Sequence, residues 1–306
     1  MAQGFAALAA ARGKARPALR RVASDPAVDR RAAAEAAAPA RADLDAARLA
    51  LRRLGCGDDA GDDIEVLACF CLPTHLVVQK AGDPRDGAAL PLPPHAQLEL
   101  MREIAGLVEA VPPGQREVVP AARWPDDVYS ALGADGSERR LRPRIFHVSA
   151  HGVTRDAWWH AGAPSGSLLF NGGSKAGGAA LPGRDEVVDA LKTCGDGLEL
   201  VFFNACKSLE LARYVVRQLP GLRAVCWKGR VHDGAARAFA KAFYAHVGAA
   251  PACEPADAFA AAKAAMAAQD FVVGDPDPWP RPPARLGGKK LDRRPHGQPC
   301  FLGPVF

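Results

Sequence analysis

Two stretches decide the fold: IFHVSAHG at residues 145–152 and LELVFFNACKS at residues 198–208. Each begins with β-branched, aromatic and aliphatic residues, which predict a buried strand, and each ends in reactive or polar side chains. The segment between them contains a helical apolar pattern over residues 183–194. A strand, a helix and a second strand in this order predict parallel pairing through a right-handed crossover.

The same alternation extends outward over most of the chain. Residues 64–80 hold two β-prone runs around Pro73, which predict a hairpin or two successive strands. The other predicted strands span residues 116–119, 145–150, 168–170, 198–205 and 223–227, and the predicted helices span 95–110, 124–132, 183–194, 208–219, 232–247 and 256–269. The fold class is therefore α/β, with a mostly parallel central sheet and helices on both faces.

Composition excludes several classes of protein. The 306 residues are 49% hydrophobic and 24% charged, as in globular proteins. No apolar run is long enough to span a bilayer, so no membrane partner is expected. The formal net charge of +5 is too small to indicate nucleic-acid binding, and none is expected.

The chain divides into three parts. Residues 1–61 form an Ala- and Arg-rich segment with a predicted helix over 30–54, residues 62–272 form the α/β domain, and residues 273–306 form a Pro- and Gly-rich basic tail. A cytoplasmic location is expected. Organellar targeting by residues 1–24, which contain no acidic residue, is the alternative.

The cysteines point to a reduced protein without a metal or cofactor. Eight cysteines in this length are too few for a disulfide scaffold, and no paired CxxC units occur. Cys69 and Cys71 lie in an apolar run and are interpreted as buried structural residues, as is Cys226. The stretch NGGSKAGG at 171–178 lacks the spacing of a phosphate-binding loop and is interpreted as a hairpin connection.

Reactive side chains follow two of the predicted strands directly. His151 comes after the strand at 145–150, and Cys206 comes after the strand at 198–205. The carboxyl ends of neighbouring parallel strands meet at one edge of a sheet, so an imidazole and a thiol are expected to face one cleft. We expect an imidazolium and the N-terminus of the following helix to lower the pKa of the Cys206 thiol.

These blocks resemble a known family. The His-Gly pair, followed about 50 residues later by a strand that ends in Ala-Cys, is similar to the caspase pattern. Together with AVCWKGRVHDGAARAFAKAFYAHV at 224–247 and AFAAAKAAM at 258–266, they resemble successive blocks of the CHAT family of caspase-like domains. The resemblance covers roughly residues 62–270 and implies a caspase-haemoglobinase fold.

The resemblance also implies roles for individual residues. Cys206 takes the place of the nucleophile, His151 that of the general base and acid, and the backbone amides of Gly152 and Cys206 that of the oxyanion hole. Asn204 takes the place of a residue that lines the substrate pocket. Asp156 or Asp233 would supply the charge of that pocket and Trp227 its wall, although a core role for Trp227 is also open. His147 is interpreted as a hydrogen-bonded core histidine, with orientation of the dyad as the alternative.

The function expected from this pattern is that of a cysteine endopeptidase, which hydrolyses peptide bonds of a protein or peptide substrate with a Cys-His dyad. The alternative is a catalytically silent CHAT module that binds or signals, because a fold does not guarantee activity. A small-molecule enzyme with a cysteine nucleophile fits the topology but not the family blocks. The oligomeric state does not follow from the sequence.

Overall fold

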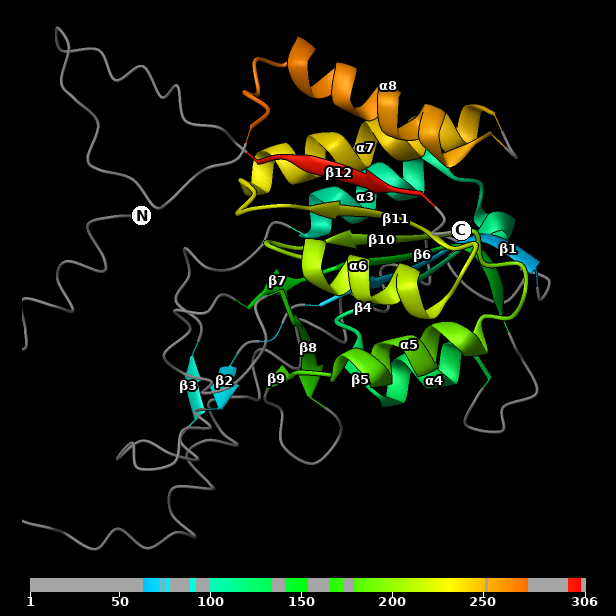
Figure 1. Ribbon diagram of the computed structural model, residues 1–306, viewed down its shortest axis with the longest axis vertical. Helices are drawn as coiled ribbons and strands as arrows, with labels where there is room; N and C mark the ends of the chain where they lie inside the picture. The colour runs from blue at the N-terminus through cyan, green and yellow to red at the C-terminus, as the bar shows by residue number, and fades with distance from the viewer. Residues whose placement is uncertain are drawn as a thin grey trace, which may run out of the picture.

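The central element of the structure is a six-stranded sheet with the order β12-β11-β10-β6-β1-β4. The computed structural model describes residues 63–71, 73, 75–77, 89–91, 100–133, 141–153, 166–172, 179–250, 253–274 and 297–303. The sheet is formed by β1 (Asp63–Phe70), β4 (Arg116–Pro120), β6 (Arg142–Ser149), β10 (Leu200–Asn204), β11 (Arg223–Trp227) and β12 (Pro299–Leu302). Its strands are parallel apart from β12, which confirms an α/β fold with a mostly parallel sheet (Figure 1).

Helices cover both faces of this sheet. They are α3 (Leu100–Ala110), α4 (Asp126–Ala131), α5 (Arg184–Thr193), α6 (Leu209–Gln218), α7 (Asp233–Ala249) and α8 (Pro255–Ala268). In Figure 1, α3, α7 and α8 lie above the sheet and α4, α5 and α6 below it. None of the helices in the described part of the chain has the length and apolar content needed to cross a membrane.

The strand order explains this division of the helices. The chain steps from β1 outward to β4, then returns past β1 to β6 and continues in that direction to β10 and β11. Because parallel crossovers are right-handed, a reversal of direction moves the connecting helix to the opposite face. Helix α3 lies in the connection from β1 to β4, which runs in the first direction. Helices α4, α5 and α6 lie in the connections that run in the second direction.

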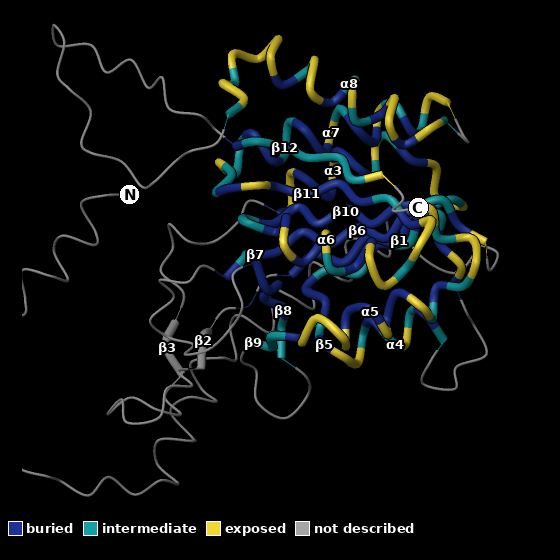
Figure 2. The backbone as a smooth tube through the Cα atoms, in the orientation of Figure 1, coloured by how far each residue is buried: buried dark blue, intermediate teal, exposed yellow. Residues whose placement is uncertain are grey.

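Each face of the sheet carries its own apolar core. One cluster joins the sheet to α4, α5 and α6, and the other joins it to α3, α7 and α8. Alternate residues of each strand point to opposite faces, so Phe203 belongs to the first cluster and Phe202 to the second. The inner strands β1, β6, β10 and β11 are accordingly buried along almost their whole length (Figure 2). Near-continuous apolar strands are typical of parallel sheets covered on both faces.

A smaller group of strands lies beside the carboxyl end of β6. Strand β8 (Leu168–Gly172) pairs with β7 (His151–Gly152), β9 (Ala179–Ala180) and β5 (Arg123–Trp124). Strands β8 and β9 are antiparallel, which fits the predicted hairpin connection at 171–178, although residues 173–178 lie outside the described part.

Strand β2 (His75–Val77) pairs with β3 (Ala89–Pro91) and not with β1, so of the two alternatives predicted for residues 64–80 the structure has two successive strands. One interpretation from the sequence needs correction. The tail over 273–306 is not merely a solvated segment, because β12 pairs with the edge strand β11. The predicted N-terminal segment 1–61, including the proposed targeting residues 1–24 and the helix over 30–54, lies outside the described residues.

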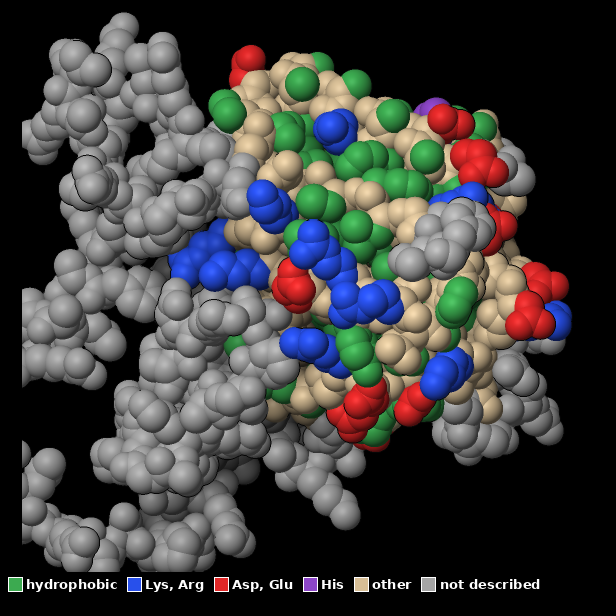
Figure 3. Space-filling view, viewed as in Figure 1, with side chains coloured by type: hydrophobic (Ala, Val, Ile, Leu, Met, Phe, Trp, Pro, Cys, Tyr) green, Lys and Arg blue, Asp and Glu red, His purple; other side chains and the backbone are tan. Residues whose placement is uncertain are grey.

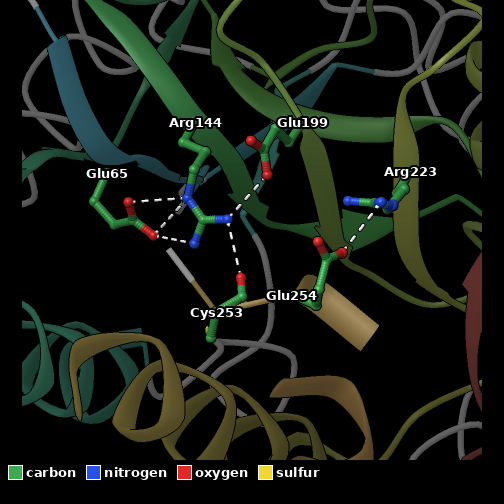
Figure 4. Close-up of polar contacts among 6 residues, drawn as sticks. All are labelled: Glu65, Arg144, Glu199, Arg223, Cys253 and Glu254. Carbon is green, nitrogen blue, oxygen red and sulfur yellow. Dashed lines mark hydrogen bonds and ion pairs between the residues drawn. The ribbon is translucent and has the colours of Figure 1, made fainter. Parts of the chain in front are cut away.

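An ion cluster holds the amino end of the sheet together (Figure 4). The guanidinium of Arg144 on β6 donates to both carboxylate oxygens of Glu65 on β1, to Glu199 before β10 at 3.0 Å and to the carbonyl oxygen of Cys253 at 3.2 Å. The Arg144 and Glu65 side chains are only 15% and 14% exposed. One guanidinium therefore links the start of three strands to the connection between α7 and α8.

We expect Arg144→Ala to lower the free energy of unfolding by about 3 kcal/mol, because it leaves the Glu65 carboxylate buried without its partner. The matched control is Arg142→Ala on the same strand, whose ion pair with Asp63 is 51% and 79% exposed and should contribute less than about 1 kcal/mol. Urea unfolding of the two variants measures the difference. Equal decreases in the free energy of unfolding would show that burial of the cluster does not contribute to stability.

Candidate active site

Gly152, the second residue of the His-Gly pair in β7, lies directly against the backbone of Cys206. A Cβ atom built on Gly152 would lie 1.8 Å from the carbonyl oxygen of Cys206 and 3.0 Å from its amide nitrogen. Only glycine allows this approach, because any side chain would collide with the Cys206 backbone. The structure thus brings together the two sequence blocks that end in His151 and Cys206.

A second glycine contacts the next residue of the same turn. A Cβ atom on Gly166, which has a φ of +88°, would lie 2.2 Å from the carbonyl oxygen of Lys207. Gly166 and Val153 are joined by a backbone hydrogen bond of 2.8 Å, so both glycines belong to one ribbon. Lys207 itself has a φ of +55°, a left-handed conformation that is strained for a residue with a side chain. The turn after β10 is therefore fixed from one side by a ribbon that carries His151.

The loop after β11 fixes the other side of this turn. Its Val231 amide donates to the Cys206 sulfur at 3.4 Å, and the sulfur donates to the Val231 carbonyl oxygen at 3.7 Å. The Lys207 amide donates to the carbonyl oxygen of Gly229 at 2.7 Å. Sequence analysis assigned no contact to Val231, because a hydrophobic residue in a loop carries no chemical signal.

Burial raises the pKa of the Cys206 thiol, contrary to the expected decrease. Hydrogen bonds from the Val231 amide, the positive charges of Arg230 and Lys207, and the Cys206 amide itself oppose this shift without overcoming it. The thiol is therefore largely protonated at neutral pH in the resting protein.

The charged neighbours of this sulfur are basic among the described residues. Figure 3 shows Lys and Arg side chains gathered on the left of the described surface, where β10 and β11 end in Figure 1. Asp233, one of two predicted sources of negative charge, lies in the first turn of α7 and accepts a hydrogen bond of 3.0 Å from Arg237. Asp156, the other, lies outside the described residues.

A buried carboxylate lies beneath the site. Glu103 of α3 is 4% exposed, and its Oε2 accepts a hydrogen bond of 2.8 Å from the Ser149 hydroxyl. Its Oε1 accepts one of 2.7 Å from the Asn204 side-chain amide. The imidazole Nε2 of His147 approaches Oε1 to 3.2 Å, without the alignment of a hydrogen bond. Ser149 and Asn204 are the last residues of β6 and β10 and are paired in register.

The network continues to the last residue of β11. The Trp227 indole donates to the side-chain oxygen Oδ1 of Asn204 at 2.8 Å. On the other face, the Ser208 hydroxyl accepts from the Trp227 amide at 3.1 Å and donates to the Phe203 carbonyl oxygen at 3.1 Å. The ends of β6, β10 and β11 are thus joined in one polar layer, and the site residues follow immediately after it.

These contacts do not fit the interpretation of Asn204 as a substrate-binding residue. Both ends of its amide are hydrogen-bonded inside the core, to Glu103 and to Trp227. Trp227 has no exposed surface and is a core residue, which was the alternative for it. His147 is a fully buried core histidine, packed against Phe70, Phe202 and Tyr244, but it lacks the expected hydrogen bond.

Sequence reasoning also missed Glu103. It lies on the apolar side of α3 between Leu100, Ile104 and Leu107, which are all buried. An acidic residue on the buried stripe of an amphipathic helix is the signal that could have identified it, because buried carboxylates need partners.

Cys69, Cys71 and Cys226 are all buried, as predicted. In the part of the chain that the structure describes, no three His, Cys, Asp or Glu side chains are grouped so that they could hold a metal ion. Compared with known proteins, the chain matches no family model and no curated protein sequence.

We expect Glu103→Leu to lower the free energy of unfolding by about 3 kcal/mol, because the buried Ser149 hydroxyl and Asn204 amide lose their acceptor. Glu103→Gln keeps one carbonyl acceptor and should lie between this variant and the wild type. The matched control is Glu109→Leu on the same helix, whose carboxylate is 72% exposed and bonded only to an exposed lysine. Calorimetry of the four proteins tests the order, and an equal effect at Glu109 would contradict it.

The raised pKa of Cys206 predicts how its reactivity depends on pH. Because the thiolate is the reactive form, alkylation by iodoacetamide should continue to rise from pH 7 to pH 9 without levelling off. Quantifying the modified Cys206 peptide by mass spectrometry separates it from the other thiols. A plateau below pH 8 would mean that the resting thiol is already ionised.

Proposed function

We propose that this chain is a cysteine endopeptidase of the caspase-like type, with Cys206 as nucleophile and His151 as general base and acid. The observation that supports the proposal is the close contact between Gly152 and the backbone of Cys206, because Gly152 directly follows His151 in the chain. A nucleophile with a base positioned beside it is the arrangement that covalent catalysis requires.

The reaction follows from the state of the thiol. His151 takes the proton of Cys206 as the sulfur attacks the carbonyl carbon of the scissile peptide bond. The negative charge that develops on the substrate oxygen is stabilised by the backbone amides of Gly152 and Cys206. The imidazolium then protonates the leaving amine, and a water molecule activated by His151 hydrolyses the thioester. Because the resting thiol is neutral, proton transfer to His151 is an essential step.

The resemblance to the CHAT family supports the same reading. The sequence blocks of that resemblance end in the residues that meet at the carboxyl edge of the sheet: His151 after β6, Cys206 after β10 and the loop after β11. The α/β architecture with a mostly parallel sheet is consistent with a caspase-haemoglobinase fold, which we propose as the finer classification.

The charges around the sulfur bear on substrate preference. Arg230 and Lys207 act on the Cys206 thiol, while Asp233 is bonded to Arg237. A cationic surrounding favours an acidic side chain in the substrate over a basic one. We therefore propose an acidic or neutral residue next to the scissile bond, in place of the Arg or Lys that a pocket closed by Asp156 or Asp233 would accept.

A catalytically silent module is the second candidate. The raised pKa of Cys206 favours it, because a protonated thiol without an effective base is inert. The two candidates differ in one property, which is the turnover of a peptide.

The test is cleavage of a peptide library by the purified chain, read by mass spectrometry. We expect cleavage that is lost in Cys206→Ala and reduced at least about 1,000-fold in His151→Ala. Cys253→Ala, which removes another partly buried thiol far along the chain from the dyad, is the control and should retain full activity. Circular dichroism verifies that each variant folds.

Two outcomes decide between the candidates. Activity that survives Cys206→Ala would identify another nucleophile. A folded wild-type protein that cleaves nothing and does not react with peptidyl electrophiles at Cys206 would favour the silent module.

A further inference from the structure

A second pair of thiols lies at the edge of the sheet, on β11 and β12. Cys226 and Cys300 are directly opposite each other in this antiparallel pair. The Lys228 amide donates to the Gln298 carbonyl oxygen at 3.0 Å, and hydrogen-bonded positions alternate along an antiparallel pair. Cys226 and Cys300 therefore also occupy a hydrogen-bonded position, at which Cα atoms are about 5.5 Å apart. Disulfides join cysteines at this separation.

Both side chains lie on the same face of the sheet. Cys226 is part of the core cluster formed with α4, α5 and α6, and Cys300 packs against that cluster. The Cys226 thiol donates to the Cys300 carbonyl oxygen at 3.8 Å, and the Cys300 thiol donates to the Gln298 carbonyl oxygen at 3.7 Å. Cys226 is fully buried, while Cys300 is partly exposed on the edge strand. Cys300 is therefore the more accessible of the two thiols.

The surroundings assign different roles to the two sulfurs. The neighbouring Cys226 thiol lowers the pKa of Cys300 to about 7 against the effect of its burial, and the charge of Lys228 assists. The proximity of Cys300, together with burial, raises the pKa of Cys226. Cys300 is thus the thiolate that reacts first, and Cys226 is the thiol that follows.

We propose that Cys226 and Cys300 form a dithiol site that a low-molecular-weight disulfide oxidises to a disulfide between β11 and β12. The Cys300 thiolate attacks one sulfur of the oxidant, forms a mixed disulfide and releases the first thiolate. Cys226 gives up its proton and attacks the Cys300 sulfur, which releases the second. Two protein thiols are oxidised, and one small disulfide is reduced to two thiols.

The proposal does not depend on the peptidase function. The bond would fix the C-terminal strand to the sheet beside the loop that contacts Cys206, since Lys228 and Gln298 are the next hydrogen-bonded pair along the strands. A cross-link of this kind restricts the unfolded chain, so the oxidised protein should melt at a higher temperature.

The experiment treats the full chain with glutathione disulfide at pH 7, quenches in acid and maps the peptides without reduction. We expect a linked Cys226–Cys300 peptide that dithiothreitol reverses. In Cys226→Ser the reaction should stop at a glutathione adduct on Cys300, and in Cys300→Ser neither position should react. In the same protein at pH 7, iodoacetamide should modify Cys300 at least about tenfold faster than Cys253, whose thiol pKa burial raises.

Cys253→Ser is the matched control, since Cys253 is also partly buried and should not affect the linked peptide. A wild-type protein that keeps the adduct on Cys300 without forming the linkage would overturn the proposal. So would preferential oxidation of Cys253 or pairing of Cys300 with a different cysteine. The wild-type map alone is decisive if a serine variant fails to fold.

Discussion

The burial of one carboxylate, that of Glu103, constrains the carboxyl end of the sheet. A carboxylate removed from water must be hydrogen-bonded, and the donors here are the last residues of β6 and β10, with the last residue of β11 attached through Asn204. Any shift of one strand along its neighbours would break these bonds. The relative positions of three strand ends, and of the residues that follow them, are fixed by this requirement.

Beyond this polar layer, close backbone packing positions the turn at Cys206 and Lys207. Gly152 and Gly166 let a ribbon touch the backbone of the turn at Cys206 and Lys207, at distances that a side chain would prevent. Lys207 is held in a left-handed conformation because its amide bonds to Gly229 and the chain on either side is anchored. A strained turn held on both sides orients its cysteine better than a flexible loop would.

The edge strand β12 contains Cys300 and pairs with the strand whose following loop contacts Cys206. It pairs with β11, whose final residue takes part in the Glu103 network and whose following loop contacts the Cys206 sulfur. Cys206 and Cys300 are both partly buried, yet burial dominates at Cys206 while a thiol partner and a lysine dominate at Cys300. Residues of the same type in one protein are thus suited to different reactions by their neighbours.

Sequence alone determined the class of fold, because alternating apolar runs of strand and helix period can be buried together only in covered parallel layers. It also placed His151 and Cys206 at the ends of strands, since strand ends follow from local patterns. Tertiary structure alone decided that β12 joins the sheet, that Asn204 and Trp227 belong to the core, that Glu103 binds the ends of β6 and β10, and that burial raises the pKa of Cys206. Each of these features depends on contacts between residues far apart in the chain. A local sequence pattern does not show which distant residues will bury a given side chain.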